Sequence, residues 1–139
     1  MTAATTLATI LRVDAAACGG MGLLLLAAAP QLAVLLGLPL ELLRTVGALL
    51  VPFGVFLFWL APRASRRRAV VRAVVAGNWA WVVASIVLVA SPASPRTSIG
   101  YAFVVLQAVI VAGFAYLEQR EVGRTHAAVG ERGATSAVS

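Results

Sequence analysis

Four long apolar stretches, separated by short polar joints, constrain this 139-residue chain more than any other feature. They cover residues 15–30, 45–62, 73–90 and 99–117. A helix needs about 20 apolar residues to cross the hydrocarbon core of a bilayer, which is about 30 Å thick. Each stretch comes close to that length. The sequence therefore predicts an all-α integral membrane protein, folded as an antiparallel four-helix transmembrane bundle.

The composition excludes a soluble domain and argues against a nucleic-acid partner. Hydrophobic residues make up 61% of the chain and charged residues 12%, whereas a soluble domain carries about 25% charged residues. The net charge of +6 comes entirely from arginine, because the sequence has no lysine. These arginines gather at span ends and in one joint, where membrane proteins place them for orientation. We therefore interpret the basic charge as a membrane signal.

Few residues offer chemistry of their own. The single cysteine, Cys18, allows neither an internal disulfide nor a multi-cysteine metal site, and we expect it to be a small packing residue. The sequence has no glycine-rich phosphate loop, no serine-centred nucleophile elbow and no pair of acids within one of the four stretches. We predict no catalytic residue, no metal and no cofactor.

Helix boundaries follow from proline, glycine and charge. Pro30 should end the first helix, and Pro52 should kink the second by removing a backbone hydrogen bond. The first stretch could be taken for a signal peptide, but Asp14 stands where its apolar region should begin, which favours a retained span. The predicted spans are residues 7–29, 40–60, 69–90 and 98–118, with an interfacial segment over 31–36 and a partly disordered cytoplasmic tail over 119–139.

The distribution of arginine predicts the orientation. The joint over residues 62–68 holds four arginines, and the segment after residue 118 adds three more. The other two joints hold only Arg44 and Arg96. The positive-inside rule therefore puts the arginine-rich joint and both termini in the cytoplasm. We expect a multi-pass protein of a bacterial inner membrane.

Asp14 is the main candidate for function. It lies about two turns inside the first predicted helix, and an ionisable residue inside a membrane is costly enough to indicate a role. Three interpretations stay open. Asp14 pairs structurally with Arg72 at a similar depth, or it binds a proton or another cation, or it reaches toward the inner interface.

Asn78 heads a second polar group. Asn78, Trp81 and Ser85 share one face of the third predicted helix because they are three and then four residues apart. Gln107 lies at a comparable depth in the fourth. An Asn78–Gln107 amide pair would join the two helices. The alternative is a small polar pocket lined by Asn78, Trp81 and Gln107.

Small residues in the first span predict close helix packing. Gly19, Gly20 and Gly22 each follow another small residue at a distance of four, which lets helix backbones approach. The partner can be a helix of this chain or of a second copy.

Two sets of charges look solvated. Glu41 and Arg44, three residues apart at the start of the second helix, should form an ion pair. Glu118 and Glu121, with the arginines around them, look like a solvated end of the fourth helix.

Three short motifs carry a resemblance. With Leu-Arg-Val-Asp at 11–14, Gly-Leu-Pro at 37–39 and Asn-x-x-Trp at 78–81, the chain resembles an uncharacterised group of small four-span bacterial membrane proteins over residues 10–118. This resemblance implies the four-span fold and no particular activity.

In size, span count and a first-span acid, the chain is also similar to small multidrug resistance transporters. That resemblance implies a transport role for the acid. In those transporters the acid is a glutamate surrounded by membrane aromatics. Here it is Asp14, close to Arg12, and the first two spans hold no Tyr or Trp except Trp59.

Three functions are compatible with the sequence. The first is a small non-enzymatic accessory module that packs against a partner membrane protein or a copy of itself, or holds a lipid-like ligand in a cleft near Pro52. The alternative is a small dimeric proton- or cation-coupled transporter or channel that uses Asp14. The third is a membrane enzyme acting on a lipid or quinone. An open cavity at Asp14 favours transport, and a closed contact with Arg72 favours the module.

Overall fold

The computed structural model describes residues 2–92 and 95–136, with side chains as far as residue 124. All regular structure in these residues is helical, and none of it is strand. The elements are α1 (Ala3–Ala27), α2 (Ala29–Leu36), α3 (Leu40–Leu60), the 3₁₀ turn η1 (Ala61–Arg63), α4 (Arg68–Ala90) and α5 (Ser98–Ser136).

Four segments are long and apolar enough to cross a membrane: Ala3–Ala27, Leu40–Arg63, Arg68–Ala90 and Ser98–Arg124. The shortest has 23 residues, which at 1.5 Å per residue gives about 35 Å, more than the thickness of a hydrocarbon core. This length and composition confirm the predicted membrane-type helices and indicate a multi-pass membrane protein. α5 continues beyond Glu118, where the sequence analysis placed its end.

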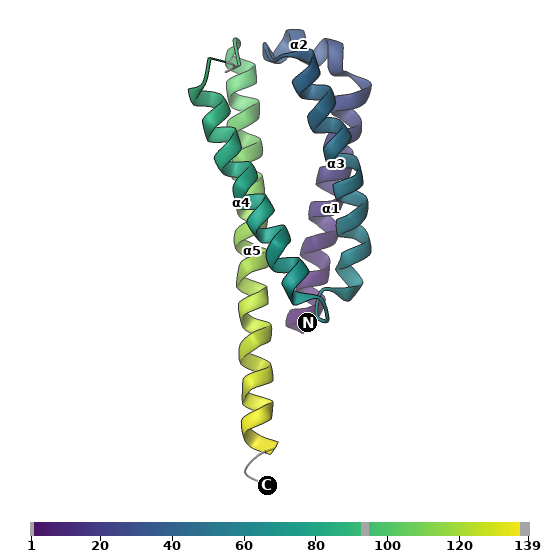
Figure 1. Ribbon diagram of the computed structural model, residues 1–139, viewed down its shortest axis with the longest axis vertical. Helices are drawn as coiled ribbons and strands as arrows, with labels where there is room; N and C mark the ends of the chain where they lie inside the picture. Colours follow the sequence, from purple (N-terminus) through teal and green to yellow (C-terminus); the bar gives the residue numbers. More distant parts are fainter. Residues whose placement is uncertain (1, 93–94, 137–139) are drawn as a thin grey trace.

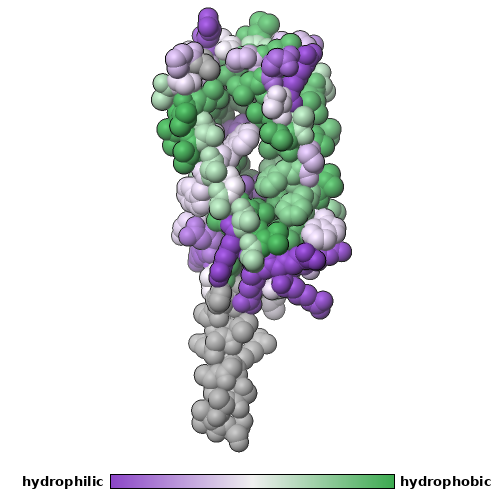
Figure 2. Space-filling model, viewed as in Figure 1, coloured by the Kyte–Doolittle hydropathy of each residue, from purple (hydrophilic) through white to green (hydrophobic). Residues whose placement is uncertain are grey.

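The surface has the pattern of a membrane protein. Large apolar side chains such as Phe58 and Leu106 are more than 60% exposed. An apolar band lies between polar layers at the two ends (Figure 2). In water such a surface would drive aggregation, but lipid tails are as apolar as these side chains.

The four long helices form two packed pairs. α1 lies against α3, and α4 lies against α5 (Figure 1). The α1–α3 contact is close at Gly22, where an added Cβ would lie 2.9 Å from the Val51 nitrogen and 3.0 Å from the Gly47 oxygen. Gly22 therefore has the close-packing role predicted for it.

The other two glycines differ from this expectation. A Cβ added at Gly19 or Gly20 would meet nothing within 4 Å. Gly19 contributes through its backbone instead, because a Cβ on Gly54 would lie 2.8 Å from the Gly19 nitrogen. Gly20 lies on an exposed face of α1, and a Cβ there would meet nothing within 4 Å in this chain, so close packing at Gly20 stays a prediction for a second copy.

The two pairs meet near both ends. At the arginine-rich end, a buried cluster joins Leu7 and Leu11 of α1 to Leu60, Val71 and Val122.

At the opposite end, the short helix α2 contacts the start of α5. The Thr97 hydroxyl donates to the Leu35 carbonyl at 2.8 Å, and the Arg96 N–H donates to the Gly37 carbonyl at 3.2 Å. Gly37 ends α2 with a φ of 62°, a conformation that glycine adopts without strain.

Candidate functional site

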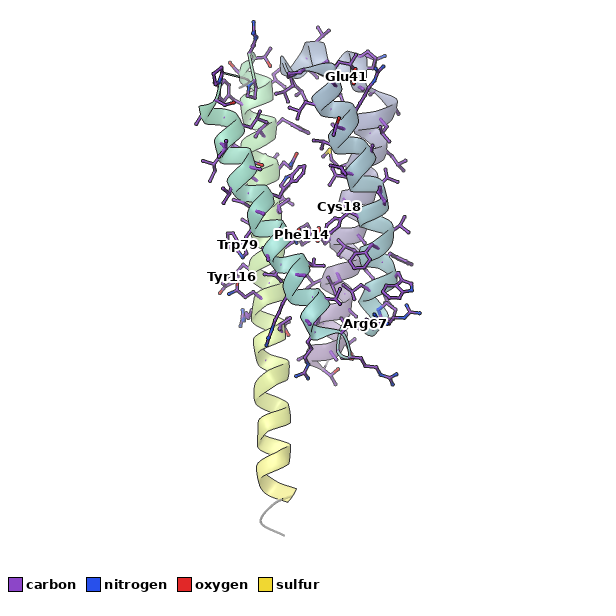
Figure 3. All side chains as sticks on the ribbon, in the orientation of Figure 1. Cys18, Glu41, Arg67, Trp79, Phe114 and Tyr116 are labelled. Carbon is purple, nitrogen blue, oxygen red and sulfur yellow. The ribbon has the colours of Figure 1, made fainter. Side chains whose placement is uncertain are left out.

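A cleft of about 460 Å³ lies between the α1–α3 pair and the α4–α5 pair. Most of its lining is apolar and includes the rings of Phe53, Phe103 and Phe114. Two of the polar lining residues, Asp14 and Asn78, close one end, which we call the floor of the cleft. Figure 2 shows this face of the molecule hollowed between the pairs, and Figure 3 labels Cys18 and Phe114, which line the hollow from opposite pairs.

The hollow continues toward α2. A second cavity of about 360 Å³ shares Trp81, Phe103 and Gln107 with the cleft. Ser85 also lines this second cavity, and its hydroxyl donates to the Trp81 carbonyl at 2.9 Å. The shared residues make the two cavities neighbours, and of the two only the cleft is lined by Asp14.

Asp14 occupies the floor because it faces inward from α1. The residue is only 2% exposed. Its Oδ1 accepts from the Cys18 thiol at 3.4 Å, and its Oδ2 accepts from Asn78 Nδ2 at 3.3 Å. Arg72 is an exposed residue that has an interaction of its own. Its predicted pairing with Asp14 stays a prediction.

Asn78 also binds a second acid. The same Nδ2 donates to Glu118 Oε2 at 3.2 Å, so one amide nitrogen gives both of its protons to carboxyl groups. The shared donor makes the two carboxyl groups neighbours. We call Asp14, Asn78 and Glu118 the carboxyl–amide cluster.

The expectation that Glu118 and Glu121 are solvated is wrong. Glu118 is fully buried and Glu121 is 5% exposed. Within the described part of the chain, Glu118 Oε1 and Glu121 Oε2 are buried without a hydrogen-bond partner. Both acids are covered because α5 continues past the predicted span end and packs on α1 and α4 there. Arg124 is exposed, as expected.

Helix spacing places Glu118 on the buried face of α5. Buried residues of α5 include Val104, Ala115 and Val122. Glu118 lies three residues after Ala115 and four before Val122, so it shares their helix face.

The Asn78–Gln107 amide pair is not what the structure favours. The Asn78 amide donates to the two acids, and Gln107 lines the hollow beside Trp81. Asn78, Trp81 and Gln107 thus line one space, which is the pocket alternative of the sequence analysis.

The remaining predicted positions lie away from the floor. Pro52 is inside α3 and exposed, while its neighbour Phe53 lines the cleft. The predicted Glu41–Arg44 ion pair is confirmed, with 3.4 Å between Oε1 and Nη1. Both side chains are more than half exposed, so the pair contributes at most about 1 kcal/mol.

The donor set fits a proton better than a transition metal. Among the described residues, no group of three or more His, Cys, Asp and Glu side chains could hold a metal ion. Structural and catalytic zinc sites need at least three such ligands. Two carboxyl groups that share one amide donor can instead hold a proton between them.

No known protein family matches the chain, and no curated protein or solved structure matches it significantly.

Proposed function

We propose that this chain is a small proton-coupled membrane carrier whose cleft binds a hydrophobic, positively charged small molecule. One observation carries the proposal: Asp14 and Glu118 are buried together on one Asn78 amide at the floor of the cleft. This is the transport alternative of the sequence analysis, with a second acid added.

Electrostatics supports the proton. A charge inside a membrane is costly, and two adjacent carboxylates repel each other strongly where water is excluded. Glu118 Oε1 has no hydrogen-bond partner, so a proton on this group has room. When no ligand is bound, the carboxyl–amide cluster therefore holds one shared proton. It releases this proton when a cation binds beside Asp14.

The lining of the cleft supports a hydrophobic cation. A volume of about 460 Å³ lies in the range of sites for drug-sized ligands. Aromatic faces such as those of Phe53, Trp81 and Phe114 attract positive charge as well as apolar groups. Among the described lining residues, none carries a positive charge that would repel such a ligand.

The arginine-rich end supports an orientation. Arg63 Nη1 donates to the Trp59 carbonyl at 2.7 Å, and the Arg63 and Arg67 guanidinium groups lie 4.6 and 5.1 Å from the centre of the Trp59 ring. Tryptophan with arginine is typical of a membrane interface. We propose an antiparallel bundle in a bacterial inner membrane, with this end and both termini in the cytoplasm.

The partners follow from the same surface. The exposed apolar faces of α4 and α5 suit lipid tails or a second copy of the chain. A dimer stays part of the proposal.

An accessory module that holds a lipid is the second candidate. The observation in its favour is the almost wholly apolar lining of the cleft. A module that holds a lipid does not need buried acids. The two candidates therefore differ in whether ligand binding depends on the charge of Asp14.

Binding to the full chain in detergent tests the proposal. Tetraphenylphosphonium serves as a hydrophobic cation, and triphenylphosphine oxide serves as an uncharged molecule of similar bulk. We expect calorimetry to show tighter binding of the cation, and Asp14→Asn to weaken it about tenfold or more, equivalent to about 1.4 kcal/mol. Glu41→Gln, a change in an exposed acid at the other end, is the matched control. Equal binding of both molecules, with no effect of Asp14→Asn, would favour the lipid-holding module.

A further inference from the structure

We infer that Glu121 is a proton relay residue that connects the carboxyl–amide cluster to the arginine-rich end of the molecule. The inference rests on the proposed function, because it gives the shared proton a route. It assigns a role to a buried acid that the cleft itself does not use.

The first observation is that the burial of Glu121 has an unexplained cost in free energy. Glu121 is 5% exposed, and its Oε2 has no hydrogen-bond partner among the described residues. A buried polar group without a partner costs about 1–3 kcal/mol, and more when it is charged. The ion pair with Arg124 uses only Oε1, so it does not account for the burial of Oε2.

The second observation is spacing. Glu121 follows Glu118 by three residues on α5, so the two side chains share a face with about 5–6 Å between their Cβ atoms. Glu118 is joined to Asp14 through Asn78. The three acids therefore form a line that starts at the cleft floor and ends about 4.5 Å beyond Glu118 along the helix.

The third observation concerns the groups at the outer end of this line of acids. Glu121 Oε1 accepts from Arg124 Nη1 at 3.2 Å, and the Arg124 side chain is 61% exposed. Arginine stays protonated and cannot relay a proton itself. Its exposed guanidinium places the outer side of Glu121 next to a solvent-accessible group.

The other charged groups at this end belong to α1 and α4. Arg12 and Arg72 are exposed and Arg68 is half-buried, and Arg68 and Arg72 have interactions of their own. The buried residues that α1 and α4 contribute at this end, including Leu11 and Val71, are apolar. Glu121 is thus the acid placed between outside water and Glu118.

The transfer moves one proton and no electrons. The Glu121 carboxylate takes a proton from a hydronium ion, which leaves as water, passes the proton to the Glu118 carboxylate directly or through one water, and becomes a carboxylate again. The ligand enters through the apolar cleft, so ligand and proton use different openings.

Hydrogen–deuterium exchange of the protonated carboxyl group tests the relay. The full chain in lipid bilayers is transferred to D₂O, and infrared spectroscopy follows the carbonyl band of the protonated acid. The sequence has five acidic residues, so at neutral pH this band reports the buried ones. We expect Glu121→Gln to keep the amplitude of the band and to slow its shift about a hundredfold, the usual effect of losing a positioned acid–base group.

Two further variants complete the test. Glu121→Asp keeps a carboxyl group on a shorter side chain and should give a rate between those of wild type and Glu121→Gln. Glu41→Gln should exchange like wild type. If Glu121→Gln does not fold, an unchanged rate in Glu121→Asp overturns the relay.

Different results would overturn the relay and the proposed function. A full band that exchanges at the wild-type rate in Glu121→Gln overturns the relay and leaves the carboxyl–amide cluster intact. A wild-type chain without the band, or a band that survives the double change Asp14→Asn and Glu118→Gln, overturns the proposed function.

Discussion

Asn78 of α4 donates to Glu118 of α5 at 3.2 Å, although 40 residues separate them in the chain. The same nitrogen donates to Asp14 of α1 at 3.3 Å. The hydrogen bonds of one amide therefore connect three helices and join the two helix pairs. It also brings two acids side by side in the apolar part of the molecule, which is the basis of the proposed function.

Replacing Asn78 should destabilise the fold. Asn78→Leu keeps most of the volume and leaves both acids without their shared donor. We expect the free energy of unfolding to fall by about 1–3 kcal/mol, because buried polar groups lose a hydrogen bond. Reversible unfolding in mixed micelles measures this.

The neighbouring residue provides the control. Trp79→Phe removes a hydrogen bond to Gln119 from a side chain that is 40% exposed. Its effect should stay within about 0.5 kcal/mol, as for most surface substitutions. Equal losses for the two variants would mean that the Asn78 amide has no special role.

The membrane helices were predictable because hydropathy depends on composition alone. Asp14 could be identified as a candidate because an acid about two turns inside a predicted membrane helix stands out. The cleft was not predictable from the sequence, because lipid-facing residues are as apolar as core residues. They leave no periodic polarity to show which helix faces meet. Val105, which faces outward, and Val104, which is buried, are the same residue type.

Glu118 was missed for a different reason. A charge near the end of an apolar stretch is normally solvated or reaches the interface. At Glu118 the helix continues and packs on α1, so burial depended on contacts between residues far apart in the sequence.

Gly22 and Gly20 should respond oppositely to alanine. Gly22→Ala forces a methyl group against the backbone of Val51 and Gly47, and such overpacking costs about 1–3 kcal/mol. Gly20→Ala meets open space and should be neutral or stabilising by up to about 1 kcal/mol, as alanine favours helix. Thermal unfolding in detergent compares the two, and a stable Gly22→Ala would contradict the close α1–α3 contact.

Gly37 should be equally intolerant. Its φ of 62° is strained for alanine, and an added Cβ would lie 2.8 Å from the Arg96 nitrogen. We expect Gly37→Ala to lower the free energy of unfolding by about 1–3 kcal/mol. Gly113→Ala, where a Cβ meets nothing within 4 Å, is the control. A similar midpoint for both variants would show that the α2–α5 contact does not hold the ends together.

Trp81 should report the ligand. Among the three tryptophans, Trp81 lines the hollow, whereas Trp59 and Trp79 are at least 40% exposed. We expect tetraphenylphosphonium to change the tryptophan emission of wild type and of Trp79→Phe, and to leave that of Trp81→Phe unchanged. A response that persists in Trp81→Phe would place the probe outside the cleft.

Proton release on binding tests the central claim most directly. Calorimetric titration of the full chain with tetraphenylphosphonium is repeated in buffers with different ionisation enthalpies. If the carboxyl–amide cluster exchanges its proton for the cation, the heat of binding depends on the buffer in wild type, and this dependence disappears in Asp14→Asn. Binding of the cation with the same heat in every buffer would show that no proton leaves, and it would contradict the account.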